Sequence, residues 1–204
     1  MLKVHHLRIG RSVFTVWLLE ELGVSYELEI YIRNELGRAP PELKAVHPLG
    51  KSPVIEVEGQ ILAESGAIAL YLLDTYDVDN RLGPPKDDPL AKAQWMQWLH
   101  YSEASAFAPL LIKLLLSRLE EKPALFEMFS SAEVALQLGY LQDQLGESDY
   151  LLGDRFQAPD IGATYIVDMA HRLNELSAYP KLAAYRERCR ARPAFQRAFD
   201  RTGG

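Results

Sequence analysis

The sequence predicts a mixed α/β domain at residues 1–77, a linker at residues 78–89 and an all-helical domain at residues 90–204. Strand-like and helix-like segments alternate in the first part of the chain. The linker, VDNRLGPPKDDP, is polar and rich in proline, which is typical of a connection between elements. Beyond it the periodic segments are all helical. A small α/β domain joined to a helical one is a specific combination of layers.

The first domain is expected to run βαβ, then a short helix, then ββα. The first helix has Val13, Val16 and Trp17 at helical spacing, and Gly23 supplies its C-terminal stop. Glu58-Gly59 lies between two short runs and is a two-residue hairpin signal. The expected strands are Leu2–Leu7, Tyr26–Tyr31, Val54–Val57 and Gln60–Ala63, and the expected helices are Ser12–Leu22, Pro40–Val46 and Ser65–Tyr76.

The second domain is expected to contain five helices. The first of them, Leu90–Arg118, is long and has apolar residues at helical spacing. Shorter helical patterns follow it after gaps that carry turn residues. They are Ala132–Leu145, Asp160–Leu173, Tyr179–Arg190 and Pro193–Phe199.

Composition excludes several classes of protein. The 204 residues include 22 basic and 28 acidic side chains, and the net charge of −6 argues against nucleic acid as a partner. The single cysteine, Cys189, forms no intrachain disulfide and fits a reducing compartment. The N-terminal stretch MLKVHHLRIG does not read as a signal peptide, and the longest apolar run, Pro109–Leu116, is too short for a membrane span. We therefore expect a cytoplasmic protein without a membrane span.

The dipeptide Ser52-Pro53 directly precedes an expected strand. A cis proline at this point turns the chain sharply and leaves the backbone N–H and C=O of the preceding residue facing outward. Such groups can pair with an extended peptide as an added strand does. The alternative is an ordinary trans-proline turn, which the dipeptide alone favours because cis X-Pro bonds are roughly 5% of the total.

The segment Glu64-Ser65 opens the third expected helix of the first domain. Ser65 is a good N-cap residue, and the free N–H groups of a helix N-terminus form a natural carboxylate site. Glu64 beside it can accept hydrogen bonds from an ammonium group. The two residues together would hold the head group of an α-amino acid, and the alternative is an ordinary cap with a solvated acid.

Longer stretches of the chain carry a family resemblance. HHLRIGRSVFTVWLLEELGVSYE, PPELKAVHPLGKSPVI and ILAESGAIALYLLDTY occur in this order before the linker, and WMQWLHYSEASAFAPLLIKLLL, YLLGDRFQAPDIGATY and YPKLAAYRERCRARPAFQRA occur after it. Together they resemble the cytosolic glutathione S-transferase superfamily. The chain is most similar to a bacterial and fungal branch with the HPLGKSP and LAESGAI motifs. The resemblance covers nearly the whole chain.

The resemblance implies a fold and a ligand. The first domain would be thioredoxin-like, with a mixed sheet and Pro53 as the cis-proline. Ser52 would pair its backbone with the cysteinyl unit of glutathione, and Val54, two residues further on, belongs to the same glutathione-binding turn. Glu64 and Ser65 would bind the γ-glutamyl head of the co-substrate, and Lys51 matches a position that contacts the glycine carboxylate. Members of the family are homodimers, which is also expected here.

The thiol-activating end departs from the branch pattern. A transferase must hold the glutathione sulfur as a thiolate, although a free thiol has a pKa near about 8.5. The branch has polar residues where this chain has Ile9 and Gly10, and an arginine where it has Phe14. Family members use a tyrosine, serine or cysteine at the end of the first strand or the start of the first helix. The first 25 residues of this chain contain no tyrosine, and two catalytic candidates remain. Ser12 would donate its hydroxyl, although capping the first helix is its ordinary role. Arg11 would stabilise the sulfur as a fixed cation, and a surface salt bridge is its alternative.

Other polar residues carry weaker predictions. Tyr101, Glu103 and Ser105 lie on the long helix that usually walls the electrophile pocket of the family, and plain helix-surface positions are the alternative. His5 and His6 are adjacent on a strand and point to opposite faces, so no metal site is expected.

Three functions follow from these features. The first is conjugation of glutathione to small hydrophobic electrophiles. The second is glutathione-dependent reduction of peroxides or disulfides, to which the loss of polar residues at Ile9 and Gly10 adds weight. The third is a non-catalytic protein that binds glutathione or another ligand.

Overall fold

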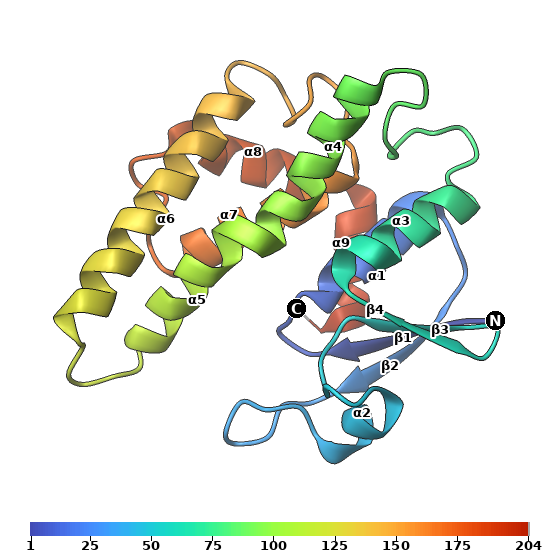
Figure 1. The fold of residues 1–204 in the computed structure, drawn as a ribbon, viewed down its shortest axis with the longest axis horizontal. Coiled ribbons are helices and arrows are strands. Elements are labelled where there is room, and N and C mark those ends of the chain that lie inside the picture. Colours follow the sequence, from blue (N-terminus) through green and yellow to red (C-terminus); the bar gives the residue numbers. More distant parts are fainter. Residues whose placement is uncertain (204) are drawn as a thin grey trace. The chain divides into compact units, whose positions relative to one another are not determined.

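The computed structural model describes residues 1–203, which form two compact units (Figure 1). The first unit comprises Met1–Gly83 and the C-terminal segment from Ala191 onward. The second comprises Pro84–Arg190. The first unit therefore contains a segment from each end of the chain.

A four-stranded mixed sheet organises the first unit. Its strand order is β2-β1-β3-β4, with β1 parallel to β2 and antiparallel to β3, and with β3 antiparallel to β4. This arrangement confirms the predicted α/β fold. The strands are β1 (Leu2–Leu7), β2 (Glu27–Tyr31), β3 (Val54–Val57) and β4 (Gln60–Ala63), and the helices between and after them are α1 (Ser12–Leu22), α2 (Pro41–Val46) and α3 (Ser65–Tyr76).

Local signals explain several of these boundaries. Gly23 ends α1 in a left-handed conformation with φ of 68°, which glycine adopts without strain. The β3–β4 turn has φ of 51° at Glu58 and 77° at Gly59, as a two-residue hairpin of type I′ requires. Figure 1 shows α1 and α3 on one face of the sheet and α2 on the other.

The last helix, α9 (Pro193–Thr202), packs on α1 in the first unit. The Trp17 and Phe195 rings meet edge to face with centroids 4.9 Å apart. Arg192 also holds Glu21 through two hydrogen bonds, of 2.7 and 2.8 Å. The predicted helical domain included this segment, because helical spacing identifies a helix without identifying the unit on which it packs.

The second unit is entirely helical except for one isolated bridge. Its helices are α4 (Pro89–Tyr101), α5 (Phe107–Leu116), α6 (Ala124–Leu145), α7 (Ala158–Arg172) and α8 (Pro180–Arg190). A π-helical segment, Ser102–Ala106, divides the single long helix that was predicted, and α6 begins at Ala124 rather than Ala132.

The buried carboxylate of Asp160 joins elements of the second unit. It accepts hydrogen bonds from the Gln157 and Leu151 amides at 2.8 and 3.0 Å and from the Tyr185 hydroxyl at 2.8 Å. Both halves of a capping box are present at the start of α7, because the Gln157 side chain accepts from the Asp160 amide while the Asp160 side chain accepts from the Gln157 amide. Among residues 1–203, no helix combines the length and hydropathy that a membrane crossing needs.

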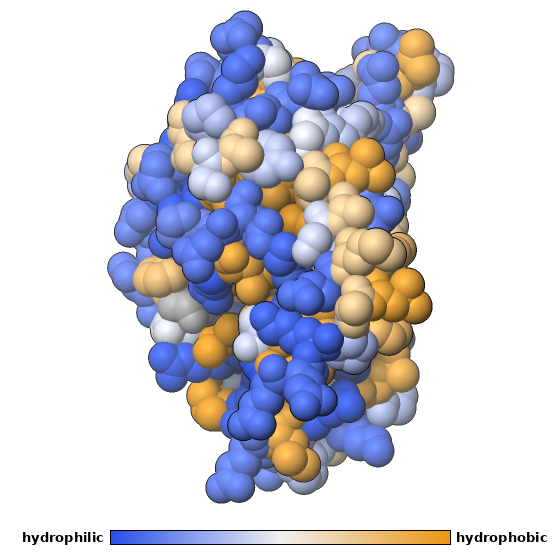
Figure 2. All heavy atoms as spheres, turned by 90° about the vertical axis from the view of Figure 1, so that its left-hand side faces the viewer, coloured by the Kyte–Doolittle hydropathy of each residue, from blue (hydrophilic) through white to orange (hydrophobic). Residues whose placement is uncertain are grey.

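Apolar side chains are exposed on α6. Figure 2 views a face of the molecule on which orange apolar side chains gather between blue polar ones. The exposed apolar residues of α6 are Leu125, Phe126, Met128, Phe129, Leu136 and Tyr140.

Candidate functional site

A cis peptide bond joins Ser52 to Pro53 immediately before β3. The Ser52 hydroxyl donates a hydrogen bond to the His5 carbonyl at 2.7 Å and accepts one from the Leu7 amide at 3.1 Å. In register, the β1–β3 ladder ends at the pair His5 and Val54. The Ser52 side chain therefore takes up the next hydrogen-bonding groups of β1 in place of its own backbone.

The Ser52 backbone is consequently available to another peptide. Within residues 1–203, its N–H and C=O make no hydrogen bond to another main-chain group. Lys51 is exposed beside it, whereas Pro53 and Val54 are buried. Val54 pairs with strands on both sides, so its side chain supports this turn from the core.

The start of α3 lies next to this turn, because the register pairs Val54 with Ala63, the last residue of β4. Glu64 follows with φ of 74° and occupies the N-cap position, while Ser65 is the first helical residue. The predicted N-cap at Ser65 is therefore wrong by one position. The Glu64 side chain is exposed and makes no capping hydrogen bond, so its carboxylate is accessible to a ligand.

The loop between β1 and α1 has an unusual backbone. Ile9 adopts a left-handed conformation with φ of 57°, which is a genuine outlier for a β-branched residue, and its side chain is 64% exposed. Gly10 follows, and a Cβ at this position would lie 2.8 Å from the Leu7 carbonyl oxygen. Glycine is therefore required here by a close approach of the backbone.

Arg33, from the loop after β2, holds this backbone in place. Its guanidinium donates to the carbonyls of Arg8 at 3.2 Å and Ile9 at 3.1 Å. The sequence does not single out Arg33, because it lies 24 positions from Ile9 along the chain and belongs to no motif.

Ser12 and Arg11 occupy different environments at the start of α1. Ser12 is fully buried, and its hydroxyl forms a 2.8 Å hydrogen bond with Nδ1 of His6. The N-cap residue is Arg11, with no side-chain capping bond, so the expected capping role of Ser12 is wrong. Arg11 is half-buried and sits between Gly10 and the first turn of the helix.

The two histidines of β1 have separate partners. His6 is buried against Ser12, and this burial, together with the nearby Arg8 charge, lowers the pKa of His6 to about 4. His5 instead contacts the Tyr31 hydroxyl through Nδ1 at 2.9 Å. No group of three or more potential metal ligands occurs in residues 1–203.

The predicted electrophile-pocket residues lie where α4 passes into the π-helical segment. Tyr101 is buried, its hydroxyl donates to the Gln137 carbonyl at 2.9 Å, and burial with Tyr140 nearby raises its pKa. Glu103 is half-buried and Ser105 is exposed.

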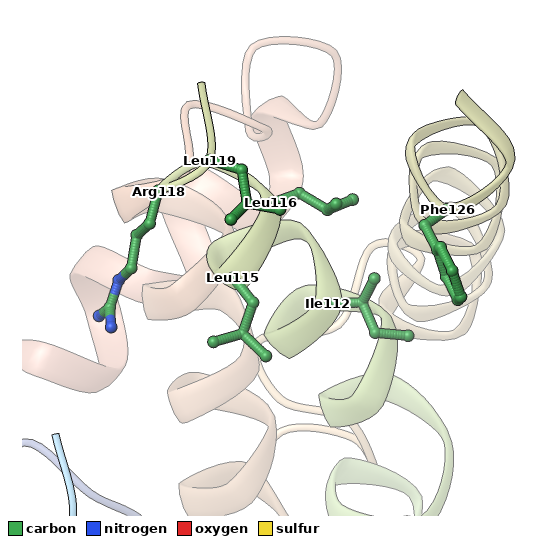
Figure 3. Close-up of a pocket in the computed structure, with 6 residues that line it drawn as sticks. All are labelled: Ile112, Leu115, Leu116, Arg118, Leu119 and Phe126. Carbon is green, nitrogen blue, oxygen red and sulfur yellow. The ribbon is translucent and has the colours of Figure 1, made fainter. Parts of the chain in front are cut away.

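An apolar hollow of about 410 Å³ opens instead at the end of α5 and the start of α6 (Figure 3). None of the three predicted pocket residues lines it. Its lining residues are Ile112, Leu115, Leu116, Arg118, Leu119 and Phe126.

Comparison with known proteins matches both parts of the chain. Residues 2–74 match the model of the glutathione S-transferase N-terminal domain, and residues 106–193 match that of the C-terminal domain. Glutathione S-transferase 1 of Saccharomyces cerevisiae is 32% identical over 83% of this chain and 81% of its own length.

Solved structures agree with this assignment. A glutathione S-transferase from Actinobacillus pleuropneumoniae superposes with a TM-score of 0.90 at 34% identity, over 100% of this chain and 94% of that one. A glutathione transferase from Methylococcus capsulatus superposes with a TM-score of 0.84 at 25% identity, over 100% and 99%. The chain therefore belongs to the glutathione S-transferase family.

Proposed function

We propose that this protein is a glutathione transferase that binds glutathione, stabilises its thiolate and conjugates it to small hydrophobic electrophiles. The observation that carries this proposal is the juxtaposition of the Ser52-Pro53 turn with Glu64 and Ser65 across the β3–β4 hairpin. The Ser52 backbone, the Glu64 carboxylate and the N-terminus of α3 there match the cysteinyl backbone, the ammonium group and the α-carboxylate of a γ-glutamyl peptide.

Each part of glutathione has a partner in this arrangement. The cysteinyl backbone pairs with the N–H and C=O of Ser52, as an added strand does, while Pro53 and Val54 shape the turn. The γ-glutamyl carboxylate accepts from the N–H groups at Ser65 and the first turn of α3, and its ammonium group donates to Glu64. Lys51 faces solvent at the edge of the turn and attracts the glycine carboxylate.

The unusual backbone at Glu64 supports this binding role. A non-glycine residue at φ of 74° is held in a sparsely populated conformation, and such residues cluster at ligand-binding sites. In this conformation Glu64 has an exposed side chain while its carbonyl accepts the first hydrogen bond of α3, from Ile68 at 2.9 Å.

We assign stabilisation of the thiolate chiefly to Arg11. A cation at the start of α1 lowers the pKa of a nearby thiol by favouring its charged form. Ser12 was the second catalytic candidate, but its hydroxyl is fully buried and bonded to His6. Ser12 therefore supports the loop that carries Arg11.

The conjugation step is a nucleophilic substitution with no change in the oxidation state of sulfur. The thiolate attacks an electrophilic carbon, a C–S bond forms, and the leaving group departs with its electron pair. With a chloronitrobenzene the leaving group is chloride. We propose Tyr101, Glu103 and Ser105 as contacts of the electrophile, a homodimer as the assembled form and the cytoplasm as the location.

We propose residues 1–77 as the glutathione-binding domain, residues 78–89 as the linker and residues 90–204 as the helical domain, whose last helix, α9, packs in the first unit on α1.

The exposed apolar side chain at Ile9 favours one alternative reaction. Where no polar side chain faces the sulfur, reduction of hydroperoxides or disulfides by glutathione is the competing activity. A non-catalytic glutathione-binding or other ligand-binding protein is the remaining alternative.

Calorimetric titration with glutathione, followed by turnover on three substrate types, separates these functions. We expect glutathione to bind and a chloronitrobenzene to be conjugated faster than a hydroperoxide or a mixed disulfide is reduced. Faster reduction of the hydroperoxide or the disulfide would mean that the protein is a glutathione-dependent reductase and not a transferase. Binding without turnover would leave a binding protein, and absence of glutathione binding would overturn the whole proposal.

A further inference from the structure

The loop that follows β2 contains a turn that fixes the position of Arg33. Within it, the side-chain oxygen of Asn34 accepts hydrogen bonds from the amides of Leu36 at 3.1 Å and Arg38 at 2.9 Å. The Asn34 backbone closes the same turn, because its N–H donates to Arg38 and its C=O accepts from Gly37. Arg33 then donates through Nη1 to the Gly37 carbonyl at 2.9 Å.

The remaining N–H groups of Arg33 reach the loop between β1 and α1. Nε donates to the carbonyl of Arg8, and Nη2 donates to the carbonyl of Ile9. These two carbonyls belong to the peptide groups on either side of Ile9. A rigid planar guanidinium that holds both of them fixes the φ and ψ angles of Ile9 between them.

Ile9 is the residue of this loop that most needs such support. A left-handed conformation at a residue with a Cβ is disfavoured by roughly tenfold in population, and β-branching adds to the strain. Gly10 is part of the same device, since a Cβ there would lie 3.3 Å from Nη2 of Arg33 as well as close to Leu7.

We propose that Arg33 is a positioning residue for thiolate stabilisation: its fork holds Ile9 in the left-handed conformation that places Gly10, Arg11 and the start of α1 beside the glutathione sulfur. This inference rests on the proposed function, in which Arg11 stabilises the thiolate. In this role Arg33 contacts neither glutathione nor the electrophile, and it acts only through the backbone of the loop.

The first test measures the thiol pKa of bound glutathione, by the ultraviolet absorbance of the thiolate as the pH is raised. We expect Arg33→Met to raise that pKa by about one unit and to lower kcat near neutral pH roughly tenfold. Arg33→Lys keeps the charge but loses the fork, and it should behave like Arg33→Met. Arg38→Met is the matched control, because it removes an exposed arginine from the same loop that makes none of these three bonds.

The second test asks whether the backbone of Ile9 is the intermediary. In the Arg33→Met background, Ile9→Gly removes the penalty for positive φ, whereas Ile9→Ala removes the same apolar side chain and keeps the penalty. We expect Ile9→Gly to recover most of the lost kcat and thiol pKa shift, and Ile9→Ala to recover little.

The outcomes distinguish failure of this inference from failure of the proposed function. If the unmodified protein does not lower the pKa of bound glutathione, the proposed function fails. If it does so and Arg33→Met is unchanged, or Arg38→Met changes equally, the inference is overturned. Equal rescue by glycine and alanine, or a loss of glutathione affinity as large as the loss of kcat, would also overturn it.

Discussion

The Ser52–Glu64 region and the loop between β1 and α1 solve the same backbone problem in different ways. Each contains a residue with a side chain at positive φ, Glu64 at 74° and Ile9 at 57°. Glu64 is held by regular structure on both sides, since β4 ends directly before it and α3 begins directly after it. Ile9 is held by one guanidinium from a distant loop.

This difference separates recognition from activation. The recognition region, Ser52–Glu64, uses backbone groups that the sheet and α3 hold in place, so its shape depends on many pairs of residues. The activating loop, which joins β1 to α1, depends on a few side chains: Arg33, which bonds its carbonyls, and the buried pair of His6 and Ser12 at its two ends. We therefore expect substitutions in the first region to change glutathione affinity, and substitutions in the second to change the thiol pKa or the local stability.

Lowering the pH is expected to have the largest effect on stability, and it acts through the buried His6 next to the activating loop. Because burial lowers the pKa of His6 to about 4, the folded state keeps this residue neutral while the unfolded state takes up a proton below about pH 6.5. The free energy of unfolding should therefore fall as the pH is lowered from about 6.5 to about 4, by up to about 3 kcal/mol from this residue.

Urea unfolding at several pH values checks this, with His6→Asn as the comparison. Asparagine retains a hydrogen-bonding group near the Ser12 hydroxyl and does not titrate. The stability difference between the two proteins should shrink or reverse in acid. A difference that stays constant from pH 7 to pH 4 would show that His6 does not make this contribution.

Substitution of Glu64 tests the recognition region. Glu64→Gln removes the charge that accepts from the γ-glutamyl ammonium group, and a charge-assisted hydrogen bond contributes about 2 kcal/mol, so the Kd for glutathione should rise roughly 30-fold. The pKa of the bound thiol should not change, because the activating loop is untouched.

A glutathione analogue without the α-amino group supplies the control for Glu64. It should bind the unmodified protein and Glu64→Gln with similar Kd values. An equal loss of affinity for both ligands would mean that Glu64 acts on the site in some way other than by binding the ammonium group.

Arg11 and Ser12 provide a matched pair within the activating loop. Arg11→Met should raise the pKa of the bound thiol by about one unit, equivalent to about 1.4 kcal/mol. Ser12→Ala should leave that pKa unchanged and lower the free energy of unfolding by about 1 kcal/mol, because it removes a buried partner of His6. The opposite pattern, with the pKa raised only by Ser12→Ala, would return Ser12 to the catalytic role.

The same contrast explains how much the sequence could predict. Features that depend on neighbouring residues could be predicted. Gly23 marks the end of α1, Glu58-Gly59 marks the β3–β4 hairpin, and the order of the motifs indicates the recognition region. The departure at Ile9 and Gly10 is also evident from the sequence, but its geometry is not. That geometry comes from Arg33, which meets the loop only through the folding of β1 against β2.

Other features that were not predicted also depend on contacts between residues far apart in the sequence. Ser12 resembles an N-cap in sequence, but the fold places it against His6 and gives its hydroxyl a buried partner. The last helix has a clear pattern, yet its partner Trp17 lies at the other end of the chain. The π-helical segment Ser102–Ala106 was likewise not predicted, because it lies inside the single long helix expected across this part of the chain.

Lys51 marks the weakest edge of the recognition region, and the smallest effect is expected there. It is exposed, so its attraction for the glycine carboxylate is screened by water and contributes about 0.5 kcal/mol. Lys51→Met should raise the Kd for glutathione roughly twofold at low salt, and the effect should fade as salt is added. Lys92→Met, an equal change of net charge on α4, should leave Kd unaltered. A salt-independent loss, or an equal loss with glutathione esterified at glycine, would show that Lys51 supports the Ser52 turn and does not bind the carboxylate.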